Sequence, residues 1–139
     1  LSQEKKYTSA IDVYNSILNV LPSNYQAMKE KARIMLITQQ WQEAVKLYQQ
    51  LLKIYVPEEE FYNNKAIAQI NMGNLQEALS EFNNVLNLSP TNIDALYNRA
   101  KLFKMLGEPH KAAKDIDKIK ELLKAKKNLS ESEKKLLNI

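Results

Sequence analysis

The sequence has few of the residues from which most active sites are built. It contains no cysteine and a single histidine, His110. The absence of cysteine excludes a disulfide framework, a thiolate nucleophile and a cysteine-based metal site. His110 follows Pro109 in the first turn of an expected helix, so we expect a solvated surface residue and no catalytic triad. The two glycines, Gly73 and Gly107, stand too far apart for a phosphate-binding loop. We therefore expect a protein that is not an enzyme and that binds neither a cofactor nor a metal ion.

Long apolar runs are also absent. No stretch approaches the ~20 apolar residues that a membrane-spanning helix needs, and no signal-like apolar segment follows Leu1. We expect a cytoplasmic protein without a membrane span. We also expect residues 1–139 to be a piece of a longer protein.

The charges are unevenly distributed around a net charge of +4. Residues 95–139 contain twelve lysines or arginines and six acidic residues, whereas residues 1–94 contain eight and ten. A basic end favours an acidic partner or nucleic acid, but it is also typical of lysine-rich helix faces in water. Aromatic residues are not interleaved with the lysines of residues 111–127, which disfavours nucleic-acid binding.

The most informative pattern is a repeat of fixed period. Alanine recurs every 34 residues along the chain, and a large apolar residue follows each alanine four positions later. The alanines are Ala10, Ala44, Ala78 and Ala112, and the large residues are Tyr14, Tyr48, Phe82 and Ile116. A fixed period in the range of roughly 20–50 residues is typical of a solenoid of stacked repeats.

Each repeat unit has the pattern of two amphipathic helices separated by a turn. In residues 59–92, apolar residues at helical spacing lead to a break around Gly73, and a second helix ends before Pro90. Residues 93–126 repeat this plan, with a turn at Gly107 and Pro109 in the first turn of the second helix. In residues 25–58 the glycine is replaced by Gln39, and Trp41 opens the second helix. Ser23 or Asn24 is the expected N-cap of the first helix in that unit.

The two ends depart from the regular pattern. The period places a second helix at residues 7–20, with most of its partner missing, residues 1–5 as the tail of that lost helix, and an exposed apolar flank. At the other end, Ser130 and Glu133 match a capping box. We interpret residues 131–138 as a helix that covers the last repeat, although a continuation of the parent chain that frays here has the same pattern.

These residues resemble the tetratricopeptide repeat (TPR) family, whose 34-residue units follow a W/Y…L-G…Y…A…F…A…P pattern. The resemblance runs in register over nearly all of residues 1–126, although Lys31, Lys65 and Arg99 replace the usual leucine. It implies an all-α, right-handed superhelical solenoid of antiparallel helix pairs, with about three and a half TPR units plus a C-terminal helix. We expect a single TPR domain over residues 1–139: a truncated repeat at 1–24, full repeats at 25–58, 59–92 and 93–126, and a capping helix at 127–139.

The resemblance also implies a function, because the first helices of TPR units line a concave groove that binds a peptide segment or a helix. Amide side chains in such a groove can hydrogen-bond an extended backbone, and cations can hold acidic groups. The same residues also fit the ordinary polar faces of amphipathic helices. The expected peptide-binding groove residues are Lys29, Arg33, Asn63, Asn64, Ile67, Tyr97, Asn98, Lys101 and Lys104.

The partner class implied is a protein or peptide, with acidic chemistry favoured by the lysines. Some TPR proteins hold the acidic tail of heat-shock chaperones in a carboxylate clamp, but here only Lys29 and Asn64 match that clamp, while Arg33, Asp94 and Asn98 depart from it. An alternative function remains open, in which the chain is a structural subunit of a larger assembly that packs through its terminal helices. Self-association through the exposed first half-repeat is one form of that alternative.

Overall fold

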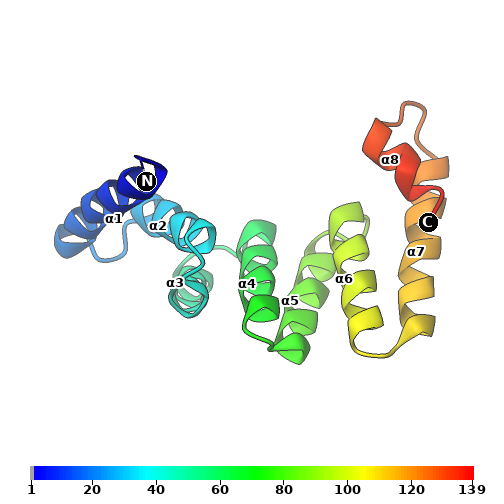
Figure 1. Cartoon of the computed structure of the whole chain (residues 1–139), viewed down its shortest axis with the longest axis horizontal. Coiled ribbons are helices and arrows are strands. Elements are labelled where there is room, and N and C mark those ends of the chain that lie inside the picture. Colours follow the sequence, from blue (N-terminus) through cyan, green and yellow to red (C-terminus); the bar gives the residue numbers. More distant parts are fainter. Residues whose placement is uncertain (1) are drawn as a thin grey trace. The chain divides into compact units, whose positions relative to one another are not determined.

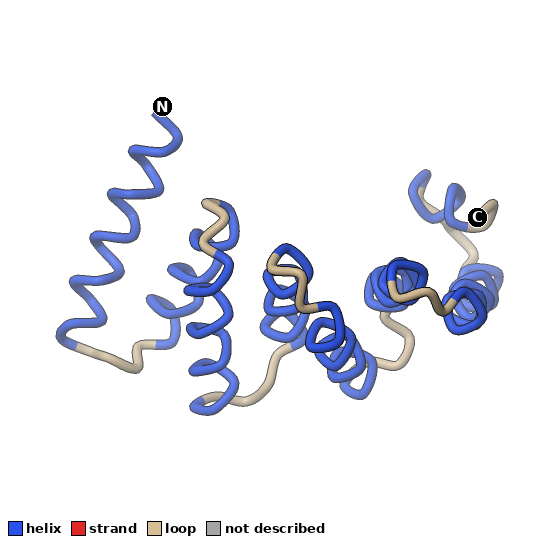
Figure 2. Tube along the Cα trace, turned by 60° about the horizontal axis from the view of Figure 1, so that its bottom comes forward, coloured by secondary structure: helices blue, strands red, loops and turns tan. Residues whose placement is uncertain are grey.

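The computed structural model describes residues 2–139, and all the regular secondary structure in that range is helical (Figure 1, Figure 2). The helices are joined by short turns. In chain order they are α1 (Ser2–Val20), α2 (Tyr25–Ile37), α3 (Trp41–Ile54), α4 (Glu59–Asn71), α5 (Leu75–Leu88), α6 (Ile93–Met105), α7 (Pro109–Lys124) and α8 (Glu131–Leu136). The all-helical fold expected from the sequence is confirmed.

Helices that follow one another in the chain pack against one another. The chain divides into two compact units, residues 1–78 and 79–139, with the division inside α5. In the first unit α1 contacts α2, α2 contacts α3 and α3 contacts α4, and in the second α6 contacts α7 and α7 contacts α8. Equivalent helices begin at the same point of each repeat: α2, α4 and α6 start at positions 25, 59 and 93, and α3, α5 and α7 start at positions 41, 75 and 109.

Each unit has its own apolar core. In the first unit the core is buried between α2, α3 and the start of α4, where the ring centroids of Tyr48 and Phe61 lie 6.0 Å apart. Its buried members are Met28, Ala32, Met35, Ala44, Leu47, Tyr48, Leu51 and Phe61. In the second unit Ala100, Phe103 and Ala112 form a buried cluster against which Leu79 and Ile116 pack. The small alanines lie where two helices meet, which allows the helix axes to approach to about 8–10 Å.

The turn within each repeat is a left-handed helix C-cap. Gln39, Gly73 and Gly107 have φ angles of 61°, 81° and 76°. In each turn the next residue donates its backbone N–H to a carbonyl five residues earlier, as Gln40 does to Met35 over 2.8 Å. The corresponding pairs are Asn74 with Gln69 and Glu108 with Phe103, each at 2.8 Å. This is the Schellman pattern, and Gln39 adopts it although its side chain disfavours a positive φ.

The helix starts agree with the sequence expectations. Asn24 caps α2 by accepting a hydrogen bond from the Ala27 N–H at 2.9 Å. Pro109 occupies the first turn of α7. Ser130 and Glu133 form both hydrogen bonds of a capping box at the start of α8. The α8 helix ends at Leu136, two residues before the expected boundary at 138.

One expectation at the N-terminal end is wrong. The α1 helix runs without a break from Ser2 to Val20, so residues 2–5 are not the tail of a separate helix; Leu1 lies outside the described residues. The segment before Tyr7 contains no glycine or proline, and its glutamine, glutamate and lysines are good helix formers. The Thr8 hydroxyl donates to the Glu4 carbonyl within the same helix.

Candidate functional site

Lys29 on α2 is an expected groove residue, and its ammonium group already has partners within the first unit. Nζ lies 3.3 Å from a carboxylate oxygen of Glu58 and 3.2 Å from the Tyr25 hydroxyl. It also lies over the rings of Tyr25 and Phe61, and the side chain is only 17% exposed. The hydrogen bond to Tyr25, opposed by partial desolvation and reinforced by Glu58, raises the pKa of Lys29 above its usual value.

Arg33, one helical turn further along α2, is likewise held by carboxylates. Its Nε donates to Glu60 at 2.7 Å, a second guanidinium nitrogen bonds the other oxygen of Glu60, and Nη1 donates to Glu30 at 2.7 Å. A bidentate pair of this kind is among the stronger charged contacts in proteins. The hydrogen bonds to Glu60 raise the pKa of Arg33 above its usual value. The acidic residues at the start of α4 therefore neutralise the basic pair on α2.

Asn64 on α4 is also engaged within the first unit. Its side-chain amide donates to the Tyr48 hydroxyl at 3.0 Å. Tyr48 is fully buried, and burial raises its pKa to about 12, while the hydrogen bond from Asn64 acts in the opposite direction. Asn63 and Ile67 are half-buried on the same helix.

The expected groove residues of the second unit lie on α6 and have a different environment. Tyr97 and Asn98 are half-buried, and Lys101 and Lys104 are exposed. The Lys101 ammonium lies 4.9 Å from the centre of the Tyr97 ring. Within the part of the chain that the structure describes, Lys101 and Lys104 form no ion pair. The α6 face therefore presents cations next to an aromatic ring, and internal carboxylates do not neutralise them.

A further polar cluster in the second unit was not predicted from the sequence. Arg99 on α6 donates to both carboxylate oxygens of Asp115 on α7, at 2.8 Å and 2.7 Å, and to Asn83 at 3.0 Å. Its guanidinium carbon lies 5.6 Å from the centre of the Phe103 ring. Arg99, which stands where the TPR pattern has a leucine, thus neutralises the negative charge of the buried Asp115. The sequence does contain a signal for this pair, which is a cation followed by an acidic residue 16 positions later. Lys65 and Glu81 have the same spacing one repeat period earlier.

The fold is similar to those of solved repeat proteins. It matches MamA residues 41 to the end from Desulfovibrio magneticus RS-1 with a TM-score of 0.83 at 17% identity, over 92% of this chain and 72% of that one. A tetratricopeptide repeat protein from Parabacteroides merdae ATCC 43184 matches with a TM-score of 0.81 at 24% identity, over 91% of this chain and 50% of that one. The family model described as TPR repeat matches residues 68–107. The chain is a TPR repeat protein.

Among curated proteins, this TPR chain is similar to sperm-associated antigen 1. It is 33% identical to the human protein over 114 residues, which is 79% of this chain and 12% of the human protein. It is 34% identical to the mouse protein over 102 residues, which is 70% of this chain and 11% of the mouse protein. The TPR chain therefore corresponds to about one eighth of the length of these relatives.

The described part of the TPR chain contains neither a metal-binding cluster nor a membrane-spanning helix. Residues 2–139 contain no cluster of three or more histidine, aspartate or glutamate side chains placed to hold a metal ion. None of the helices described is both long and apolar enough to cross a lipid bilayer. Proteins of the TPR family are generally protein-interaction scaffolds and are typically not enzymes.

Proposed function

We propose that this TPR chain is a non-enzymatic scaffold that binds an acidic polypeptide segment on the exposed face of α6. The partner lies along Tyr97, Asn98, Lys101 and Lys104, which were expected from the sequence to line the peptide-binding groove. Asn98 offers an NH2 donor group and a carbonyl acceptor to the partner backbone. Lys101 and Lys104 hold acidic side chains of the partner.

The observation that carries this proposal is the contrast between the basic pairs on α2 and α6. Lys29 and Arg33 are already paired with Glu58 and Glu60, so an incoming carboxylate would have to displace these internal partners. Lys101 and Lys104 are exposed without a carboxylate partner in residues 2–139. A cation that has no internal partner loses less when it binds an external acid. We therefore assign the acidic-peptide contact to α6.

A binding experiment on the α6 face tests the proposal. The probe is a short fluorescein-labelled peptide of alternating glutamate and leucine, titrated by fluorescence anisotropy at physiological salt. We expect a Lys101→Gln/Lys104→Gln variant to bind it about tenfold more weakly, because two charge-assisted contacts are lost. The matched control is Lys118→Gln/Lys124→Gln on α7, which removes the same charge from two exposed positions of the same unit. Equal weakening in both variants would mean that only net charge matters and that α6 is not the site.

A second candidate function is that of a structural subunit that packs through its terminal helices. It is favoured by α1, where none of the residues is fully buried, and by the exposure of Val13 and Val20, at 57% and 78%. Sedimentation of a concentration series tests its self-associating form. A dimer that Val20→Lys dissociates, and that Asn19→Lys leaves intact, would support self-association, whereas a monomer at all concentrations would exclude self-association.

A further inference from the structure

The exposed face of α6 is a single stripe along the helix. Successive residues of an α-helix are turned by about 100°, so the residues of this face fall within a sector of about 120°. All the exposed residues of α6 lie in that sector, and the rest of the helix is half-buried or buried. The residues of the α6 face are Asp94, Tyr97, Asn98, Lys101, Lys104 and Met105.

The two ends of the α6 face carry opposite charges. Asp94 lies in the first turn of α6, whereas Lys101 and Lys104 lie in its second half. With a rise of about 1.5 Å per residue, Asp94 is about 10.5 Å from Lys101 and about 15 Å from Lys104 along the helix axis. A partner that is acidic along its whole length would therefore bring a negative group toward Asp94, where like charges repel.

The carboxylate of Asp94 has no ionic partner in the part of the chain that the structure describes. Asp94 is exposed and forms no ion pair within residues 2–139. Its position in the first turn complements the positive end of the helix dipole. That long-range interaction leaves the carboxylate oxygens open to a cation of a bound partner.

The same position of the preceding repeat shows what such a carboxylate binds. Glu60 stands one repeat period before Asp94, in the first turn of α4. Arg33, which lies 27 positions before Glu60, donates to both of its carboxylate oxygens. The residue 27 positions before Asp94 is Ile67, which carries no charge. The repeat pattern thus supplies a cation to Glu60 and supplies none to Asp94.

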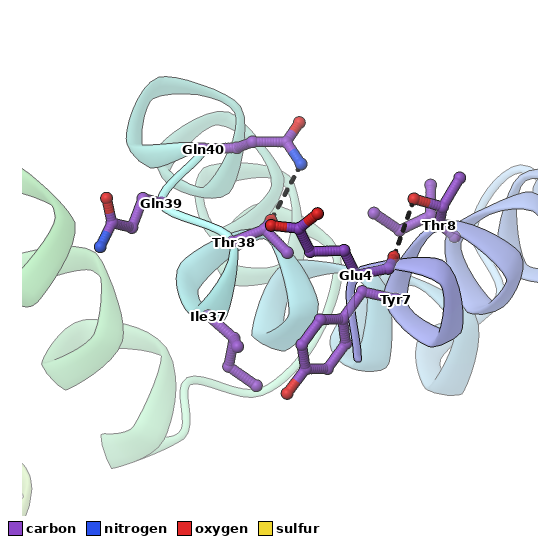
Figure 3. A pocket seen from close by; sticks show the side chains of 8 residues that line it. Glu4, Tyr7, Thr8, Ile37, Thr38, Gln39 and Gln40 are labelled. Atoms are coloured by element: carbon purple, nitrogen blue, oxygen red, sulfur yellow. Dashed lines mark hydrogen bonds between the residues drawn. The ribbon is translucent and has the colours of Figure 1, made fainter. Parts of the chain in front are cut away.

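A hollow in the first unit does not offer charges of both signs. It has a volume of about 530 Å³ and lies between α1 and the C-terminal end of α2 (Figure 3). Glu4 is the one charged residue among those that line it, and Tyr7, Thr38 and Gln40 are among the uncharged ones. A segment with charges of both signs would find no cation in that hollow, so the α6 face matches it better.

We propose that the segment bound on α6 carries charges of both signs, with a cationic side chain on Asp94 and an acidic side chain on Lys101 and Lys104. This inference rests on the proposed function and adds the order and spacing of the partner's charges. In an extended segment, side chains on one side recur every second residue, and each residue spans about 3.3 Å. Four residues span about 13 Å, which lies between the two axial separations of about 10.5 and 15 Å. The partner therefore carries its cation and its acidic group four residues apart.

Three fluorescein-labelled peptides test the charge order by fluorescence anisotropy at low ionic strength, where exposed ion pairs are least screened. The opposite-charge peptide has the core Lys-Leu-Ser-Leu-Glu, and the acidic peptide has the core Glu-Leu-Ser-Leu-Glu. The shifted peptide, with the core Ser-Leu-Lys-Leu-Glu, has the composition of the first but places its charges two residues apart. Each peptide is titrated with the chain, with Asp94→Lys and with the more conservative Asp94→Asn. The matched control is Asp117→Lys, which makes the same charge change at an exposed position of α7 in the same unit.

The measured quantity is the affinity for the opposite-charge peptide divided by that for the acidic peptide. We expect this ratio to fall about tenfold in Asp94→Lys, because attraction and repulsion are exchanged, and about threefold in Asp94→Asn. Asp117→Lys should leave the ratio almost unchanged. The shifted peptide should respond to Asp94→Lys more weakly than the opposite-charge peptide, since its lysine does not reach as far along α6.

An unchanged ratio in both Asp94 variants, or an equal change in Asp117→Lys, would overturn the proposal. An equal response of the shifted peptide would overturn the four-residue spacing. The Lys101→Gln/Lys104→Gln variant separates these results from failure of the proposed function. If it binds the acidic peptide as tightly as the chain does, the proposed function fails. If it weakens all three peptides while the Asp94 variants leave the ratio unchanged, only the charge order is wrong.

Discussion

Arg99 on α6 holds the buried carboxylate of Asp115 on α7 through two hydrogen bonds, at 2.8 Å and 2.7 Å. The side chain of Asp115 is 7% exposed and that of Arg99 is 23% exposed. Apart from the contact between Arg99 and Asn83, the two charged groups satisfy each other between the helices of one repeat. Arg99 stands where the TPR pattern has a leucine, and its bonds to Asp115 link α6 to α7.

The first prediction concerns the energetic balance of this pair. Arg99→Met alone should reduce the free energy of unfolding by about 2–3 kcal/mol, because it leaves the Asp115 carboxylate buried without its counter-ion. Arg99→Met combined with Asp115→Leu should recover most of that loss, since apolar side chains of similar volume then meet. Urea denaturation of the two single variants and the double variant measures the coupling. Additive losses in the double variant would show that the two residues do not act as a pair.

The second prediction concerns the left-handed turn residues. Gln39→Gly should raise the free energy of unfolding by about 0.5–1 kcal/mol, because glycine adopts a positive φ without the strain of a side chain. Gly73→Ala should lower it by about 1 kcal/mol for the same reason, although the space around Gly73 is open. Thermal or urea denaturation compares the two. If Gly73→Ala were neutral, the backbone at that turn would have changed its conformation to accommodate the side chain.

The helices and their turns could be predicted from the sequence because both depend on local chemistry. The repeat period, the apolar spacing and the residues at positions such as Gly73 and Pro109 act within one or two helical turns. The continuous start of α1 was missed because the repeat pattern was extended into residues 2–6, where the local helix propensity favours continuation. Residues 2–6 contain no glycine or proline to interrupt the helix, so their helix propensity determined the structure of that segment.

The environment of the candidate site could be predicted only in part. The sequence predicted Lys29 and Arg33 as groove residues whose cations can hold acidic groups of a partner, and it did not predict their bonds to carboxylates within the chain. In the structure, Glu58 and Glu60 bond these two cations from the start of α4. The link depends on α2 and α4 lying next to each other, and residue spacing alone does not reveal which of several nearby carboxylates a long side chain selects.

The third prediction concerns pH. Burial raises the pKa of Tyr48 to about 12 in the folded state, whereas an unfolded tyrosine titrates near 10. The unfolded chain therefore loses the proton first, so the contribution of Tyr48 is fully present below about pH 10 and falls as the pH rises toward 12. A shift of this size corresponds to about 2–3 kcal/mol. Tyr48→Phe should make the fall in stability between these pH values shallower, measured by urea denaturation. An unchanged slope would show that Tyr48 ionises normally.

The fourth prediction compares two alanines at the same position of the repeat. Ala44 on α3 is fully buried, and Ala44→Leu should cost about 1–3 kcal/mol of stability, because the larger side chain overpacks the contact with α2. Ala10 on α1 stands one repeat period earlier and is only half-buried. Ala10→Leu should change the free energy of unfolding by no more than about 0.5 kcal/mol, since the larger side chain of a half-buried residue can extend into water. Urea denaturation of both variants makes the comparison. An equal loss at Ala10 would mean that the face of α1 is already covered in solution, and the same variants measured at several protein concentrations would then reveal whether a second copy covers it.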